Sequence, residues 1–194
     1  QTNKLSILNQ EKVIQNFRYE EPSLKEYPLY KKIVKVLDRL DMGVENSYKC
    51  IEKLMIYFNS TIGKTLSQYN AGIYRYCTID NMDNKTVPVE LKEYIGWKGI
   101  HSCYSLYNKD MVHEMLGESC YAQMSSPIRR IIDIINMIEI HIHKNLCIVT
   151  KNTIQFKDDW KDKVDIINSK RKAIKIMESE TKLLDYYLTC LLYT

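Results

Sequence analysis

Apolar residues recur at steps of three and four along two segments of the chain, and this spacing predicts a mostly helical protein. The clearer segment begins at Asn46 or Ser47, either of which can cap a helix. Its apolar positions are Ile51, Leu54, Met55, Phe58, Ile62 and Leu66. A similar pattern predicts a helix over roughly 29–40. Gly and Pro number only 6 and 4 in 194 residues, which argues against an all-β protein with many tight turns.

Short β-branched and aromatic runs add a few strands to this helical pattern. Residues 72–78 predict one strand, and residues 146–150 predict a second, shorter one. Residues 80–85 are expected to form a polar loop, and residues 89–110 show little pattern. A last helix is predicted over about 159–192, with a break near Asn168. We therefore expect an α+β fold that is mostly helical.

The best-marked helix start in the chain is Ser126-Pro127. Ser126 is a favourable N-cap, and Pro127 would occupy the first helical position, where its missing N–H costs nothing. The predicted helix runs to His143 or Lys144, and Asn145 can stop it because Asn tolerates the left-handed backbone conformation.

Arg129 and Arg130 are the candidate functional residues that this helix start selects. The chain has 22 Lys but only 6 Arg, a bias typical of an AT-rich genome such as that of a parasite or a large DNA virus. Two cations in the first turn face the positive end of the helix dipole, at a cost of about 0.3–1 kcal/mol each. A bound phosphate would offset this cost. The alternative is a surface helix in which Arg129 pairs with Asp133, and both interpretations stay open.

Composition and motifs exclude several classes of protein. The net charge of +4 is compatible with nucleic-acid binding but does not require it. The six Cys include no C-x-x-C pair, which argues against a zinc site. The chain lacks the motifs of serine hydrolases, P-loop NTPases and Rossmann enzymes. It also has no signal peptide and no run of 18 apolar residues, so we expect a cytoplasmic protein without a membrane segment.

Several motifs resemble those of the RNB (RNase II) family of 3′-to-5′ exoribonucleases. The most specific is His113-x-x-Leu116-Gly117-x-x-x-Tyr121-x-x-x-Ser125-Ser126-Pro127-Ile128-Arg129-Arg130-x-x-Asp133. Four further segments are similar to family motifs and occur in the family's order, namely residues 16–21, 51–59, 73–75 and 171–180. The similarity spans about residues 14–190.

The resemblance implies processive hydrolysis of single-stranded RNA from its 3′ end, with release of nucleoside 5′-monophosphates. The family uses two divalent metal ions, usually Mg²⁺, held by aspartates in the first half of its catalytic domain. This sequence has no such aspartate cluster. The resemblance therefore implies that residues 1–194 are the C-terminal half of an RNB catalytic domain, inactive alone and without metal ligands of its own. Its implied partners are the N-terminal half, the 3′ end of single-stranded RNA and RNA-binding domains of the OB type.

The resemblance also assigns roles to individual residues. Arg129 matches the family's catalytic arginine, which contacts the scissile phosphate. Glu178 matches a second catalytic position, a glutamate on the last helix that supports the RNA end. Glu52 matches a glutamate near the terminal ribose, where a carboxylate can accept from the 2′-OH. The remaining matches are expected to shape the RNA channel and bind phosphate, and they are Tyr121, Ser126 and Arg130.

One departure from the family pattern keeps a second function open. The His-Arg pair that follows the arginine motif in the family is Met137-Ile138 here, so a basic contact is lost. The favoured hypothesis is an exoribonuclease. Its alternative is a non-catalytic module that binds RNA or serves as a scaffold. A third hypothesis is a helical interaction domain in which the Ser-Pro-Ile-Arg-Arg segment has no RNA role.

Overall fold

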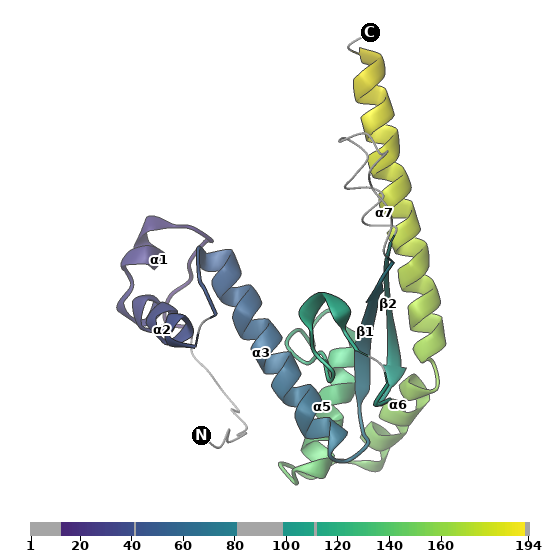
Figure 1. Ribbon diagram of the computed structural model, residues 1–194. Helices are drawn as coiled ribbons and strands as arrows, with labels where there is room; N and C mark the ends of the chain where they lie inside the picture. Colours follow the sequence, from purple (N-terminus) through teal and green to yellow (C-terminus); the bar gives the residue numbers. More distant parts are fainter. Residues whose placement is uncertain (1–12, 41, 81–98, 111, 193–194) are drawn as a thin grey trace. The chain divides into compact units, whose positions relative to one another are not determined.

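The computed structural model describes residues 13–40, 42–80, 99–110 and 112–192, without the side chains of 189–192. Helices dominate the described chain, and two strands form a small antiparallel sheet (Figure 1). The elements in chain order are α1 (Pro22–Glu26), α2 (Pro28–Arg39), α3 (Ser47–Ser67), β1 (Ile73–Ile79), β2 (Ile100–Leu106), η2 (Glu114–Leu116), α5 (Ile131–His143), α6 (Lys151–Lys161) and α7 (Val164–Leu192). The expected α+β, mostly helical fold is confirmed.

The helices predicted from apolar spacing are present. The helix predicted over 29–40 is α2, and the one predicted from 46 or 47 is α3. Asn46 caps α3, because its side-chain oxygen accepts the Lys49 N–H at 2.9 Å. The predicted stop at Asn145 is also confirmed, because this residue has φ 50° directly after the end of α5.

Two predictions in the C-terminal part are wrong. Residues 146–150 form no strand; Thr150 instead caps α6, its side chain accepting the Thr153 N–H at 3.3 Å. The last helical region breaks at 162–163 rather than near Asn168, so that α6 and α7 are separate helices. Asn168 lies inside α7, where its amide contacts β2 instead of breaking the helix.

The chain divides into two compact units, residues 1–61 and 62–194, and α3 passes from the first into the second. In the first unit, Glu20 caps α3 from outside the helix: its carboxylate accepts the Ser47 N–H and the Ser47 hydroxyl, each at 2.6 Å. These hydrogen bonds, together with Lys25, lower the pKa of Glu20 to about 2. Tyr19 and Tyr48 stack beside this cap, with ring centroids 4.0 Å apart.

In the second unit, β1 and β2 pair in an antiparallel register from Ile73 opposite Leu106 to Ile79 opposite Ile100. The strand β2 lies in the segment that shows little pattern in the sequence. One side of the sheet carries one apolar cluster, to which α5, α6 and α7 contribute. Its buried members are Ile73, Tyr104, Ile132, Ile135 and Val164.

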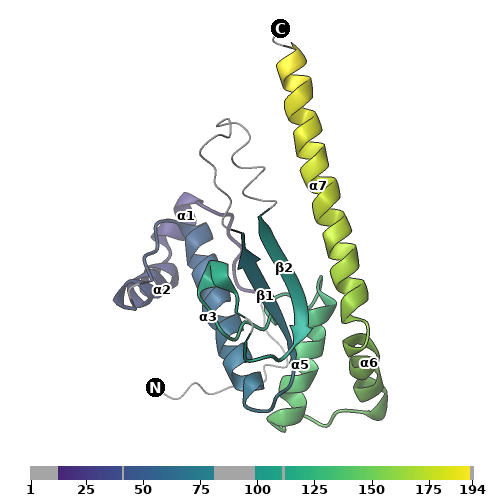
Figure 2. The ribbon, with the colours of Figure 1, turned by 45° about the vertical axis from the view of Figure 1, so that its right-hand side comes forward.

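Two asparagine side chains attach helices to the outer edges of this sheet. Asn136 of α5 accepts the Ile73 N–H at 2.8 Å and donates to the Ile73 carbonyl at 2.9 Å. Asn168 of α7 does the same for Tyr104 of β2, at 2.7 Å in both directions. Each amide therefore satisfies two backbone groups that a two-stranded sheet leaves unpaired. Consistent with this attachment, α7 runs beside β2 in both ribbon views (Figures 1 and 2).

Candidate anion-binding site

The Ser-Pro-Ile-Arg-Arg segment forms a turn and not the first turn of a helix. Residues 127–129 are in the turn, and the Ser126 carbonyl accepts the N–H groups of Arg129 and Arg130 at 3.3 and 3.2 Å. Arg130 is extended, with φ −130° and ψ 117°, and α5 begins only at Ile131. The prediction of a helix from Pro127 is therefore wrong, and both arginines precede the helix.

An ion pair between Arg130 and Asp133 explains the shape of this turn. Arg130 Nε donates to Asp133 Oδ1, and one terminal nitrogen donates to Oδ2, both at 2.7 Å. Asp133 is fully buried, and Oδ2 also accepts the Ser126 N–H at 2.7 Å. Burial alone would lower the pKa of Arg130, but the Asp133 carboxylate reverses this effect and raises it. The sequence-based alternative expected Asp133 to pair with Arg129, whereas its partner is Arg130.

Arg129 extends from this anchored turn into solvent. It is exposed, and it forms no ion pair or side-chain hydrogen bond with any part of the chain that the structure describes. Its neighbour Ile128 is also exposed. Because the ion pair between Arg130 and Asp133 anchors the turn, the backbone of Arg129 is held at a defined position while its guanidinium group stays available to a ligand.

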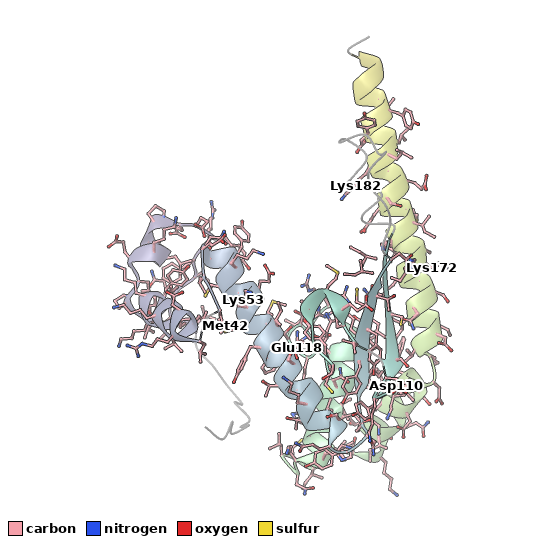
Figure 3. All side chains as sticks on the ribbon, in the orientation of Figure 1. Met42, Lys53, Asp110, Glu118, Lys172 and Lys182 are labelled. Carbon is pink, nitrogen blue, oxygen red and sulfur yellow. The ribbon has the colours of Figure 1, made fainter. Side chains whose placement is uncertain are left out.

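Two further arginines lie on the sheet side of this turn. Arg75 of β1 is directly opposite Tyr104 of β2, so the two side chains share one face of the sheet. Arg171 of α7 lies over the Tyr104 ring, with 4.5 Å from Cζ to the ring centroid. Figure 3 labels Lys172 of α7, which follows Arg171 in the sequence. Strand pairing and the Asn168 contact thus bring Arg75 and Arg171 to the same tyrosine.

This arginine cluster holds buried polar atoms that lack partners. Within the described ranges, Arg75 Nε, Arg171 Nη1 and His113 Nδ1 are buried without a hydrogen bond. Burial lowers the pKa of Arg171, and the positive charges of Arg75 and Arg130 lower it further, although Tyr104 opposes them. Neither Arg75 nor Arg171 forms an ion pair with a described residue. The cluster therefore carries more positive charge than its own carboxylate, Asp133, neutralises.

The other predicted site residues occupy different surroundings. Tyr121 is buried beside the cluster: its carbonyl accepts the Arg75 N–H at 2.8 Å, and its ring meets His113 edge-on at 5.1 Å. Glu178 is exposed on α7, two helical turns beyond Arg171. Glu52 lies on α3 in the other unit, where it forms an exposed ion pair with Lys49 at 2.8 Å.

No metal site accompanies these residues in the part of the chain that the structure describes. Over 13–40, 42–80, 99–110 and 112–192, no three His, Cys, Asp or Glu side chains form a group that could hold an ion. The described residues thus offer no ligand set for the two metal ions, which the resemblance assigns to aspartates outside this chain.

Sequence reasoning did not assign Arg75, His113 or Arg171 to the site. A signal for the two arginines was available, because in a chain with only 6 Arg each one carries information. Their proximity depends on the pairing of β1 with β2, and no pattern in the sequence indicates β2. His113 opens the most specific motif, but that motif assigned it no role, and its neighbours come from β1 and from the loop that follows η2.

Burial makes His113 a source of pH-dependent stability. Burial and then the charge of Arg75 lower its pKa from 6.5 to about 4. As the pH falls below 6.5, the unfolded chain takes up the proton first. The contribution of neutral His113 to the free energy of unfolding is therefore fully present above pH 6.5 and is lost as the pH falls toward 4. Between pH 7.5 and pH 5, the free energy of unfolding measured with urea should fall by about 2 kcal/mol less in His113→Gln than in the unsubstituted protein. The control is His101→Gln at an exposed histidine; equal losses in all three proteins would contradict the prediction.

Comparison with known proteins supports the fold. No protein-family model matches the chain, and no curated protein matches it. Among solved structures, RNase R of Mycoplasma genitalium in complex with ribose-methylated single-stranded RNA matches with a TM-score of 0.51 and 22% identity, over 77% of this chain. The apo form of the same enzyme matches with a TM-score of 0.50, 22% identity and the same coverage.

These matches place the chain against one part of a larger protein. Each covers 29% of the RNase R chain, so the present chain spans less than a third of that enzyme's length. None of the helices in the described part is long and apolar enough to cross a membrane. At 22% identity, the similarity concerns the fold alone: the α+β arrangement of this chain resembles a fragment of RNase R.

Proposed function

We propose that this chain is the part of a 3′-to-5′ exoribonuclease catalytic domain that holds the 3′ end of single-stranded RNA, with Arg129 facing the scissile phosphate. One observation carries the proposal: Arg129 is exposed and unpaired within the described residues, at the tip of a turn anchored by the buried Arg130–Asp133 pair. The RNase R-like fold supports the same role. A guanidinium group held in this way stabilises charge that develops on a phosphate during hydrolysis.

The other predicted residues take supporting roles in this proposal. Arg130 positions Arg129, because two of its nitrogens already bind Asp133, and its remaining donors can still face phosphate. Ser126 contributes through its backbone, which joins the turn to Asp133. Tyr121 shapes the wall of the RNA channel from its buried position. Glu178 and Glu52 are proposed to contact the RNA end and the terminal ribose, respectively.

The metal ions and the remaining partners belong to other parts of the proposed enzyme. We propose that two Mg²⁺ ions are bound by aspartates of the N-terminal half of the domain, and that they would supply the activated water and stabilise the leaving oxygen. The part of the protein that carries OB-type domains would guide the RNA. Within this chain, the arginines bind and orient the phosphate.

A non-catalytic RNA-binding module is the second candidate. The observation that favours it is the lack of a metal-binding group among the described residues. Both candidates require RNA binding through Arg129, but only the first requires release of nucleoside 5′-monophosphates. Incubation of the complete catalytic domain, with its N-terminal half, with RNA and Mg²⁺ separates them: monophosphate release that disappears in Arg129→Ala supports the nuclease, and binding without release supports the non-catalytic module.

RNA binding through Arg129 is tested by fluorescence anisotropy with a 5′-labelled single-stranded RNA. Arg129→Ala should weaken binding about tenfold at low salt and reduce the slope of log K against log salt by about 0.7, as expected for one lost phosphate contact. The control is Arg39→Ala, an exposed arginine at the end of α2. Equal affinity and equal slope in the two variants would refute the assignment of Arg129.

A further inference from the structure

The arginine cluster behind the turn contains a second feature that the proposed role of Arg129 does not use. Arg75 and Arg171 are half-buried, and each has a buried nitrogen without a partner among the described residues. His113 is 5% exposed and has a buried, unpartnered Nδ1 beside Arg75. Three buried hydrogen-bonding atoms from β1, α7 and the segment before η2 therefore lack partners in one neighbourhood.

The charges in this neighbourhood are not balanced by the protein itself. An arginine stays protonated in a folded protein, so it cannot relieve burial by losing its proton. Asp133 serves Arg130, and it is the carboxylate that the described structure brings to the cluster. Arg75 and Arg171 lie close enough for each charge to disfavour the other. A buried charge without a partner is unfavourable, and an anion from solution would remove this cost.

We propose that Arg75 and Arg171 bind a phosphate-type oxyanion where β1, β2 and α7 meet, with His113 beside it. Two guanidinium groups suit this ligand, since each can donate two parallel hydrogen bonds and a phosphate offers at least two oxygens to share between them. Tyr104 holds Arg171 in place through ring stacking, and Asn168 fixes the backbone of Tyr104. Arg129 is not part of this site, so the inference does not depend on the proposed function.

Thermal unfolding of the whole chain tests the site, with inorganic phosphate as the probe and NaCl at equal ionic strength as the reference. Saturating phosphate should raise Tm by about 5 °C, because it binds the folded protein alone. Arg171→Met and Arg75→Met should lose this rise while keeping folded far-UV circular dichroism. Arg171→Lys keeps the positive charge but not the paired donors of the guanidinium group, and should retain only a part of the phosphate-induced rise in Tm.

The matched control is Arg39→Met, which removes one positive charge far along the sequence and should leave the phosphate effect unchanged. No rise in the unsubstituted protein, or an equal rise in Arg171→Met, Arg75→Met and Arg39→Met, would overturn the proposal. If the methionine variants fail to fold, Arg171→Lys decides: a rise equal to that of the unsubstituted protein contradicts bidentate binding.

A second arm identifies the source of the phosphate group. A short oligouridylate with phosphodiester groups only is compared with inorganic phosphate at equal phosphate concentration. A larger, Arg171-dependent rise with the oligonucleotide assigns the site to a nucleic-acid backbone, and a larger rise with inorganic phosphate assigns it to a free phosphate. Failure of Arg129→Ala to weaken RNA binding would leave the inorganic phosphate result intact, so the two proposals fail separately.

Discussion

Replacing Arg130 by methionine is expected to lower the free energy of unfolding of the second unit by about 3–5 kcal/mol, the usual cost of removing one partner from a buried ion pair. Asp133 has no exposed surface, and Arg130 supplies two of the hydrogen bonds that its carboxylate accepts. Without Arg130, the buried carboxylate keeps the Ser126 N–H but loses its counter-charge. Urea unfolding at pH 7 measures the loss.

A double-mutant cycle separates the ion pair from simple loss of packing. Asp133→Leu alone should cost less than Arg130→Met, because the Arg130 side chain is 23% exposed and can reach water. The double variant should be considerably more stable than the sum of the single losses predicts, since neither charge is then left alone. Additive losses, or an Arg130→Met loss no larger than that of Arg39→Met, would show that the pair does not anchor the turn.

The same pair explains why the start of α5 could not be placed from the sequence. Ser126 and Pro127 are favourable residues for a helix start, and local propensity gives no reason to move the start to Ile131. The competing interaction is a carboxylate at Asp133 that binds the Ser126 N–H and the Arg130 side chain together. A preference of about 1 kcal/mol for a cap is outweighed by a buried, bidentate charge pair.

Apolar spacing was sufficient for two helices, although α2 buries only Leu37 of its apolar residues. It predicted α2 and α3, whereas the end of α5 was predicted from Asn145, which has φ 50°. It failed for β2, because the burial of this strand follows no regular alternation: two residues are exposed, four are half-buried and Tyr104 is buried. The break between α6 and α7 was placed too late for a related reason: Asn168 suits a helix end, but its amide is used to bind Tyr104.

The candidate site also combines residues that the sequence alone could select with residues that only the fold brings together. Arg129 and Arg130 are adjacent in the sequence, so a motif and a charge argument were enough to select them. Arg75 and Arg171 are 96 residues apart, as their numbers show, and meet only because β1 pairs with β2 and α7 crosses β2. Long-range strand pairing is what a single sequence specifies least visibly, and here it determines where the positive charge accumulates.

Gly63 of α3 lies against the backbone of residues 120–122, where a side chain has no room. In most helices Gly→Ala is stabilising, by about 1 kcal/mol. At Gly63 the sign should reverse, because a β carbon there would lie 2.7 Å from the carbonyl carbon of Cys120, still nearer its oxygen, and 3.0 Å from the Ala122 nitrogen. These are backbone atoms that cannot rotate away. We expect Gly63→Ala to lower the free energy of unfolding by about 3 kcal/mol.

The contact at Gly63 also connects α3 to the candidate site, which makes the variant informative about function. Residues 120–122 follow the helix closely, and the Tyr121 carbonyl between them accepts the Arg75 N–H. Displacing this segment should therefore weaken the phosphate-induced rise in Tm as well as stability. Ser67→Ala, one turn later in α3, leaves the contact unchanged and should alter stability by at most about 0.5 kcal/mol. If Gly63→Ala is as stable as Ser67→Ala, the close approach of α3 to residues 120–122 is wrong, and Arg75 loses the support that we assign to it.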